Sequence, residues 1–310
     1  MKRNRTLRIH AYGGPEVTHL DAIPVPEPGI GQVLIQVAAA GVNGLDWKVR
    51  DGLVREVFPL VLPATLGIEL AGLVMQTGPD VSRLKVGDRV MGPMGGLGAY
   101  ADFVAIDEAK LSVIPAQLTD VQAAALPVAT LTAWQAIRAA GDIKPGWRLL
   151  IHGAAGGVGG FAVQFAKAAG ATVFATASRT SREHVLGLGA DVVIDRSSER
   201  FEDRAKEINL VLDLVGGETL DRSWQVLAPD GVIVSTAAPD VAARAPAGRR
   251  GLWFMMQRDV ERLREIADTV AAGGLRSTIA EVTDFAGLAA AIERNKLGHA
   301  PGKTVLDLTR

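Results

Sequence analysis

A run of glycines between two apolar segments has the spacing that most clearly suggests chemistry in this sequence. Residues 148–170 read RLLIHGAAGGVGGFAVQFAKAAG, so Ala154, Gly156 and Gly159 fill the glycine positions of the G-x-G-x-x-G pattern. A pyrophosphate approaches backbone N–H groups at the positive end of a helix, and a Cβ at Gly156 would obstruct it. The sequence therefore predicts dinucleotide binding by Ala155, Gly156, Gly157, Val158 and Gly159. The alternative is a strand-to-helix turn that binds nothing.

The residues that end the next strand bear on which nicotinamide cofactor this turn would take. Sites that prefer NAD place a carboxylate about 20 residues beyond the turn, where it binds the ribose hydroxyls. Here that region contains Ser178 and Arg179, and the first acid is Glu183. A hydroxyl beside a guanidinium suits a 2′-phosphate, so the sequence predicts NADPH. Arg182 is a further candidate for the phosphate, and the alternative for both arginines is a solvated position at a helix start.

The composition excludes several classes of protein. With 33 basic and 34 acidic residues, the net charge of −1 provides no field to hold nucleic acid or an anionic membrane. The absence of cysteine excludes disulfides, thiolate metal sites and cysteine nucleophiles, and is compatible with a reducing compartment. No stretch reaches the roughly 18 apolar residues of a membrane helix, and no signal-peptide run follows the basic start. We therefore expect a cytoplasmic protein that acts on a small molecule.

The pattern of apolar segments predicts an α/β fold, and 310 residues suggest about two domains. Up to about residue 110, short apolar stretches broken by Gly, Pro and Asp indicate a compact barrel or sandwich of strands. Residues 119–141, rich in Ala and Leu, predict one or two helices with a cap at Thr119. From 148 to 236, apolar strands alternate with helices, which predicts a doubly wound parallel sheet. A surface loop at 237–251, an amphipathic helix at 258–274 and a final strand, helix and strand follow.

Eight sequence blocks extend the interpretation beyond the glycine turn. They are YGGPEV at 12–17, AAAGVNGLDWKVRDG at 38–52, LPATLGIELAGLV at 62–74, VGDRVMG at 86–92, AAALPVATLTAWQAI at 123–137, GAAGGVG at 153–159, LGADVVID at 188–195 and GKTVLDL at 302–308. In these blocks and their order, the sequence resembles the zinc-free quinone oxidoreductase-like branch of the medium-chain dehydrogenase/reductase superfamily. The likeness covers essentially the whole chain.

This resemblance implies a domain organisation. Residues 1–118 would form a GroES-like β-barrel catalytic domain, 119–257 a Rossmann NADPH-binding domain, and 258–310 a return to the catalytic domain. It also implies that the nicotinamide lies in the cleft between the two domains, and that two chains form a homodimer through the edge of the Rossmann sheet.

The resemblance also bears on metal binding. Zinc-dependent relatives carry a cysteine at the position of Asn43 and a histidine in the block where Ile68 stands, and this chain has neither. It also lacks the four-cysteine structural lobe of those relatives. The histidines are widely separated, without metal-ligand spacing: His10, His19, His152, His184 and His299. We therefore expect no metal site.

The same resemblance implies catalytic residues in the segment 43–48. Asn43 would contact the nicotinamide ribose or a substrate oxygen, and the alternative is an asparagine that caps a turn. Asp46, Trp47 and Lys48 follow in a segment that should line the cleft. Many quinone reductases have a tyrosine in the block where Lys48 stands, which leaves the proton donor open. A Lys48 ammonium beside the Asp46 carboxylate could polarise a carbonyl or donate a proton, and a surface ion pair is the alternative.

Further positions are candidates for contact with the cofactor. Thr132 matches a position that contacts the cofactor in the family, although a helix hydroxyl often bonds to its own backbone. Val215 and Gly216 lie at a strand end, where parallel sheets bind ligands. Asp213, in the same strand, is expected to cap backbone donors. Tyr100 faces either the substrate or the barrel interior.

These residues together predict an NADPH-dependent, zinc-independent oxidoreductase. It would transfer hydride to a quinone or to an α,β-unsaturated carbonyl (enone or enoyl) substrate, chiefly by positioning the cofactor. One alternative is a metal-free carbonyl reductase. Another is a protein that binds NADPH without turnover, as a sensor or scaffold.

Overall fold

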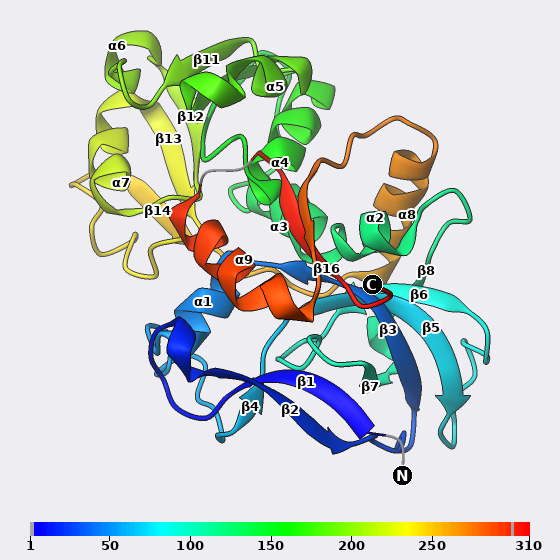
Figure 1. The fold of residues 1–310 in the computed structure, drawn as a ribbon. Coiled ribbons are helices and arrows are strands. Elements are labelled where there is room, and N and C mark those ends of the chain that lie inside the picture. The colour runs from blue at the N-terminus through cyan, green and yellow to red at the C-terminus, as the bar shows by residue number, and fades with distance from the viewer. Residues whose placement is uncertain (1–2, 299–300) are drawn as a thin grey trace. The chain divides into compact units, whose positions relative to one another are not determined.

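The computed structural model describes residues 3–298 and 301–310, which divide into two compact units. Unit 1 comprises the chain up to Val128 together with 258–310, and unit 2 runs from Ala129 to Gln257. In Figure 1, unit 1 is coloured from blue through cyan to the first green, as far as α2, and again from orange to red, and unit 2 from green to yellow. Unit 1 is therefore discontinuous, because the chain leaves it once and later returns.

Unit 1 contains two β-sheets, and its larger sheet has the strand order β15-β16-β3-β5-β6-β8, with β7 also paired to β3. The strands are β3 (Gln32–Val42), β5 (Glu69–Thr77), β6 (Arg89–Pro93), β7 (Phe103–Asp107), β8 (Ser112–Val113), β15 (Ile279–Thr283) and β16 (Lys303–Asp307). The smaller sheet has the order β2-β1-β4, with β1 (Arg3–Ile9), β2 (Thr18–Pro24) and β4 (Ala64–Thr65). The prediction of a strand-rich first segment is confirmed.

One pairing in this unit matters for the site. The last strand of the chain, β16, runs antiparallel to β3, with Thr304 opposite Val42. Lys303 therefore lies beside the end of β3, and Asn43 is the residue that follows β3 in the chain.

The helices of unit 1 each begin directly after a polar residue. They are α1 (Gly44–Arg50), α2 (Asp120–Ala124), α8 (Val260–Ala271) and α9 (Phe285–Leu297), with 3₁₀ turns η1 (Pro15–Val17) and η2 (Glu108–Lys110). As predicted, Thr119 caps α2, since its hydroxyl accepts the N–H of Gln122 at 3.2 Å. The predicted amphipathic helix is α8, and its apolar stripe of Leu263, Ile266 and Ala267 is buried.

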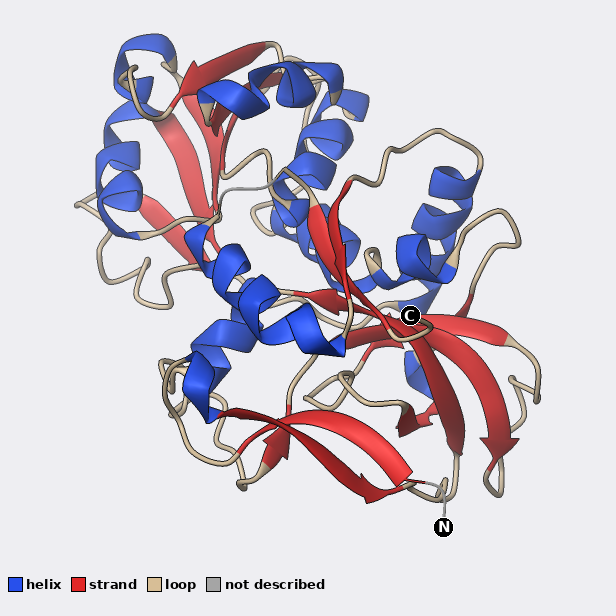
Figure 2. Ribbon diagram, in the orientation of Figure 1, coloured by secondary structure: helices blue, strands red, loops and turns tan. Residues whose placement is uncertain are grey.

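Unit 2 is a parallel sheet with helices on its faces (Figure 2). Its strands are β9 (Arg148–His152), β10 (Thr172–Ala177), β11 (Val192–Asp195), β12 (Ile208–Asp213), β13 (Leu227–Ser235) and β14 (Arg250–Trp253). In the order β11-β10-β9-β12-β13-β14, the strands β10 and β11 lie on one side of β9 and the later strands β12, β13 and β14 on the other, as in doubly wound folds. The remaining elements are α3 (Pro127–Ala136), which begins at the end of unit 1, α4 (Gly157–Ala168), α5 (Arg182–Gly187), α6 (Phe201–Arg204) and α7 (Gly217–Ser223), with 3₁₀ turns η3 (Arg179–Ser181) and η4 (Trp224–Val226).

Some sequence-based boundaries are wrong. The segment 237–251, predicted as a loop, contains the start of β14. The Ala-rich stretch 119–141 forms α2 and α3, but α3 ends at Ala136 and turns lead to Gly141. No helix in the described ranges is long and apolar enough to cross a bilayer.

Candidate functional site

In unit 2, the glycine-rich turn joins β9 to α4 as predicted. Gly156 immediately precedes the helix, and its backbone is extended at φ −74° and ψ 174°. A Cβ on Gly159 would lie 2.3 Å from the carbonyl oxygen of Gly153, so the fold itself requires glycine there. A Cβ on Gly156 would meet that oxygen at 3.4 Å, an ordinary contact. The fold tolerates a side chain at Gly156, whereas a pyrophosphate at the N-terminus of α4 would not, so this turn fits a dinucleotide.

The predicted 2′-phosphate residues lie just after β10. The Ser178 hydroxyl is 3.0 Å from that of Thr180 and 2.9 Å from that of Ser181. Arg179 is exposed and forms no hydrogen bond or ion pair with the described part of the chain. Arg182, in contrast, donates to the carbonyl of Val193 in β11 at 2.8 Å. Of the two arginines, Arg179 is the one whose guanidinium remains available to an anion.

One carboxyl group also lies near Arg179. The backbone and hydroxyl groups of Ser197, the Ser198 hydroxyl and the nearby Arg179 charge lower the pKa of Asp195, at the end of β11. The Asp195 carboxylate therefore accepts its hydrogen bonds from the turn that follows it, at Ser197 and Ser198.

A buried carboxylate shapes the end of β12. Asp213 accepts the N–H groups of Val215 at 3.1 Å and Gly216 at 2.8 Å, and the Ser235 hydroxyl at 2.7 Å. This confirms that Asp213 caps backbone donors. The loop that it holds presents Val215, which is 53% exposed. Thr132 lies in α3, and its side chain forms no hydrogen bond with the residues described.

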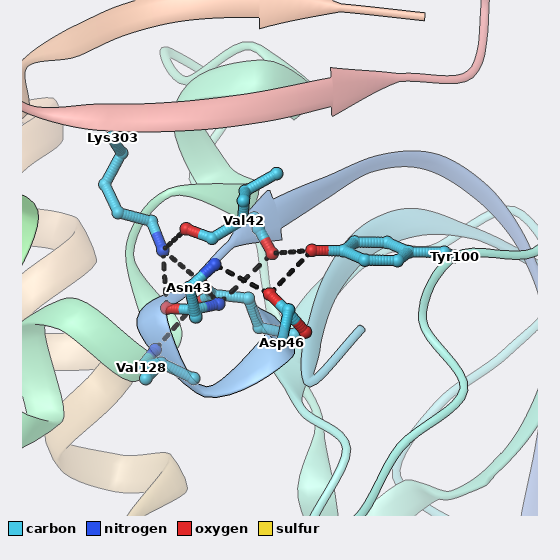
Figure 3. Close-up of polar contacts among 8 residues, drawn as sticks. Val42, Asn43, Asp46, Tyr100, Val128 and Lys303 are labelled. Carbon is cyan, nitrogen blue, oxygen red and sulfur yellow. Dashed lines mark hydrogen bonds and ion pairs between the residues drawn. The ribbon is translucent and has the colours of Figure 1, made fainter. Parts of the chain in front are cut away.

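In unit 1, a buried ammonium lies beside Asn43 (Figure 3). The Lys303 Nζ donates to the Val42 carbonyl at 2.9 Å, to Asn43 Oδ1 at 2.7 Å and to Glu69 Oε1 at 2.6 Å. An ammonium has three hydrogens, so all its donors are used. Lys303 is 5% exposed and Glu69 is fully buried, which strengthens the attraction between the two charges.

Glu69 links Lys303 to two further groups. Its Oε1 also accepts the Asn43 side-chain amide at 2.8 Å, and its Oε2 accepts the N–H of Val128 in the first turn of α3 at 2.7 Å. A Cβ on Gly41 would lie 2.2 Å from Glu69 Oε1, so the carboxylate needs glycine beside it.

Asp46 approaches Asn43 from the opposite side to this pair. Its Oδ2 accepts the Asn43 backbone N–H at 2.7 Å and the Tyr100 hydroxyl at 2.7 Å. Burial, only partly offset by these two hydrogen bonds, raises the pKa of Asp46 to about 6. Tyr100 is fully buried in the core of unit 1, which settles its side chain as a barrel residue.

The structure thus brings Asn43 and Asp46 together, and it places the Lys48 ammonium over the ring of the neighbouring Trp47. The Lys48 Nζ lies 5.6 Å from the centroid of the Trp47 ring. The Asp46 carboxylate accepts its hydrogen bonds from Asn43 and Tyr100. An ion pair of Asp46 with Lys48, as weighed from the sequence, is therefore not what holds Asp46.

Sequence reasoning missed Glu69 and Lys303. Glu69 is the single charge in the apolar run IELAGL, and Lys303 precedes the apolar residues of GKTVLDL; both side chains are buried. A buried charge is costly unless it is paired, so one acidic and one basic residue in apolar segments could have predicted a buried ion pair.

The donor set in unit 1 does not fit a zinc ion. Within residues 3–298 and 301–310, no three His, Cys, Asp or Glu side chains group as metal ligands. The oxygens of Asn43 and Glu69 face the Lys303 ammonium, a cation supplied by the chain itself. His299, weighed in the sequence as a possible ligand, lies outside the described residues.

Comparison with known proteins gives the family. Residues 29–116 match the alcohol dehydrogenase GroES-like domain, and 188–306 match a family described as zinc-binding dehydrogenase. Quinone oxidoreductase 1 of Escherichia coli is 36% identical over 236 residues, covering 74% of this chain and 71% of that protein. The solved quinone oxidoreductase of Coxiella burnetii has a TM-score of 0.94 and 34% identity, over 99% of this chain and 100% of that one.

A further solved structure is that of Escherichia coli quinone oxidoreductase complexed with NADPH. It has a TM-score of 0.90 and 28% identity, over 98% of this chain and 100% of that one. The predicted architecture, a GroES-like barrel with a Rossmann sheet, is confirmed by these matches. The chain therefore belongs to the quinone oxidoreductase family of the medium-chain dehydrogenase/reductase superfamily, whose fold takes a nicotinamide cofactor.

Proposed function

We propose that this chain is an NADPH-dependent reductase that transfers hydride, without a metal, to a quinone or an α,β-unsaturated carbonyl. The observation that carries the cofactor preference lies after β10, where Ser178 and Arg179, which is unpaired within residues 3–298 and 301–310, stand in place of a carboxylate. A guanidinium and a hydroxyl complement a 2′-phosphate, whereas NADH would meet no carboxylate in this segment for its ribose hydroxyls. The solved relative in complex with NADPH supports this preference.

Residues of unit 2 would hold the cofactor. The N–H groups of residues 155–159 at the start of α4 would bind the pyrophosphate. Thr132 would contact the nicotinamide end, as would Val215 and Gly216 on the loop held by Asp213. When bound, the cofactor supplies the hydride.

Residues of unit 1 would handle the substrate. Negative charge develops on the carbonyl oxygen as the adjacent double bond is reduced, and hydrogen-bond donors must stabilise it. Both side-chain hydrogens of Asn43 already bind Gly41 O and Glu69 Oε1, so the proposed donors are backbone N–H groups, with Lys48 as the candidate side chain of this segment. Asp46 would act by holding the Asn43 backbone, and protonation of the substrate carbon would come from water.

The proposal is tested by cofactor binding and turnover. Purified protein is titrated with NADPH and with NADH by quenching of tryptophan fluorescence, and oxidation of the preferred cofactor is then followed with quinones, enones and simple aldehydes. We expect tighter binding of NADPH, turnover of quinones or enones, and no loss of rate with a strong chelator. Turnover of aldehydes alone would favour a carbonyl reductase. Tight binding without turnover would favour a sensor or scaffold, and preference for NADH would refute the assignment of Ser178 and Arg179.

A further inference from the structure

The hydrogen bonds around Asn43 determine which way its side-chain amide faces. Its Nδ2 group donates to the Gly41 carbonyl at 3.1 Å and to Glu69 Oε1 at 2.8 Å, and its Oδ1 accepts from Lys303 at 2.7 Å. The flipped amide would set two donors together at Lys303 and two acceptors together at Glu69 and Gly41. Only one orientation is compatible with these neighbours.

In this orientation the Asn43 side chain can still accept a hydrogen bond but has no hydrogen left to donate. An amide NH₂ has two hydrogens, and both are used inside the protein. The carbonyl oxygen has two lone pairs, and Lys303 takes one. Asn43 is 9% exposed, so a small part of its surface remains accessible to a ligand.

We propose that Lys303 and Glu69 are positioning residues that make Asn43 a hydrogen-bond acceptor. Asn43 then receives a donor from the bound ligand, such as a ribose hydroxyl, and does not donate to the oxygen of a substrate carbonyl. This inference rests on the proposed function, because it assigns the role of one residue in that reductase.

The same pair extends beyond Asn43. Glu69 Oε2 accepts the Val128 N–H in the first turn of α3, the helix that carries Thr132 further along. Lys303 also binds the Val42 carbonyl at the end of β3. One buried ion pair therefore fixes the end of β3, the Asn43 amide and the start of α3 relative to one another (Figure 3). Because both charges are buried, removing one alone would leave an unpaired charge inside unit 1.

The test is a mutant cycle that removes both charges together. Lys303→Met with Glu69→Gln leaves no unpaired charge, and it is compared with Asn43→Ala and with the triple variant. We expect the charge-free variant to weaken NADPH binding by about tenfold or more, a loss typical of residues that orient a ligand-contacting group. In the Asn43→Ala background the same change should cost less than about twofold. Equal losses in both backgrounds would overturn the proposal, since the pair would then not act through Asn43.

A second readout does not depend on cofactor binding or turnover. The Asn43 side-chain amide protons, observed by NMR in ¹⁵N-labelled protein, should exchange slowly in the wild type, both without and with NADPH. They should exchange faster in the charge-free variant and stay slow in Lys303→Arg, which keeps the cation. Rapid exchange of these amide protons in the wild type would refute the acceptor assignment, even if the charge-free variant fails to fold. So would faster exchange of one of them when NADPH binds, because that hydrogen would have left its bond to Gly41 or Glu69. If NADPH does not bind at all, the proposed function fails while the exchange data still decide the orientation.

A matched control uses a lysine outside the network. Lys167 forms a half-exposed ion pair with Asp191 in unit 2. Lys167→Met should therefore leave NADPH affinity and Asn43 exchange unchanged. A comparable loss in this variant would mean that removing any lysine cation weakens binding, and the role given to Lys303 would be wrong.

Discussion

At the scale of single residues, two arginines three positions apart differ in what they contact. Arg182 donates to the backbone of β11, whereas Arg179 is exposed and unpaired among the described residues. We predict that Arg179→Gln weakens NADPH binding by about tenfold and leaves NADH binding unchanged, since a charged hydrogen bond contributes about 1.5–3 kcal/mol. Fluorescence titration with both cofactors measures the ratio of the two affinities.

Arg182→Gln is the matched control for this prediction. Its guanidinium supports the fold, so the variant should melt at a lower temperature while the NADPH-to-NADH ratio stays at the wild-type value. If Arg182→Gln changed that ratio and Arg179→Gln did not, the 2′-phosphate site would have been assigned to the wrong arginine.

Asp46 makes the stability of the protein depend on pH. Its pKa is about 6 in the folded chain and 3.8 as a model value, so the folded state binds the proton more tightly. The stability that this proton contributes is complete below about pH 4 and is lost as pH rises through about 6. We predict that Asp46→Asn removes this fall from the free energy of unfolding, as measured by urea denaturation across that range.

Tyr100 provides an independent check on the Asp46 prediction. Its hydroxyl bonds the carboxylate and lowers the Asp46 pKa, against the larger effect of burial. In Tyr100→Phe the pKa should rise further, so the loss of stability should extend to higher pH. An unchanged pH profile in both variants would show that Asp46 is not the group that titrates.

Residue types predicted the buried network of unit 1 only in part. The block at 43–48 drew attention to Asn43 and Asp46, and both belong to the buried network. Their partners Glu69 and Lys303 lie 26 and 260 positions from Asn43, and sequence spacing does not report such distant contacts. The sequence therefore named a ribose or a substrate oxygen as the contact of Asn43, but it could not show that both side-chain hydrogens bind Gly41 O and Glu69 Oε1.

At the scale of elements, two glycines in the turn between β9 and α4 are required for different reasons: Gly159 for packing of the fold and Gly156 for binding of the ligand. Ala at Gly159 would place a Cβ 2.3 Å from the Gly153 oxygen, whereas Ala at Gly156 would make an ordinary contact at 3.4 Å. We predict that Gly159→Ala lowers the free energy of unfolding by about 1–3 kcal/mol through overpacking. Gly156→Ala should fold normally but lose most of its affinity for NADPH. Thermal melting and cofactor titration of both variants measure the two effects separately.

The opposite pattern would contradict this division. If Gly156→Ala were unstable and Gly159→Ala bound NADPH with wild-type affinity and melted normally, the glycine required for packing would be Gly156. If both variants bound NADPH as the wild type does, the start of α4 would not be the pyrophosphate site.

Periodicity predicted the long elements well and the short ones poorly. The apolar runs of β9, β10 and β12 indicated a parallel sheet, because strands covered on both faces read as continuous apolar segments. The strand β14 has the sequence RGLW and pairs on one side only, so no such run marks it. The four-residue helix α6 is shorter than the window in which helical periodicity can be recognised.

At the scale of the whole molecule, a buried titratable group in each unit makes its stability depend on pH, and the two dependences have opposite signs. Asp46 is this group in unit 1 and His152 in unit 2. In unit 2, His152 is fully buried, with Nδ1 3.0 Å from the Thr176 hydroxyl and Nε2 2.9 Å from the Ser223 hydroxyl. Burial lowers the pKa of His152 from 6.5 to about 4, although Asp213 and Glu202 favour the charged form. The unfolded chain therefore binds this proton more readily, and stability is lost as pH falls from about 6.5 to 4.

The two effects have opposite signs in nearly the same range of pH. Asp46 makes unit 1 less stable as pH rises between about 4 and 6, and His152 makes unit 2 more stable over that interval. We predict that His152→Gln abolishes the acid loss of unit 2, worth up to about 3 kcal/mol at 1.36 kcal/mol per pKa unit. Four of the five tryptophans, Trp134, Trp147, Trp224 and Trp253, lie in unit 2, so Trp47→Phe makes fluorescence report on that unit alone.

Denaturation of the Trp47→Phe protein, with and without His152→Gln, therefore measures unit 2 directly. The fluorescence midpoint should fall toward pH 4 with His152 present and stay level without it, while Asp46→Asn should leave this midpoint unchanged. If Asp46→Asn shifted the fluorescence midpoint as much as His152→Gln does, the two units would unfold as one. Acid stability would then be a property of the whole chain, because the two protonation equilibria would act on a single transition.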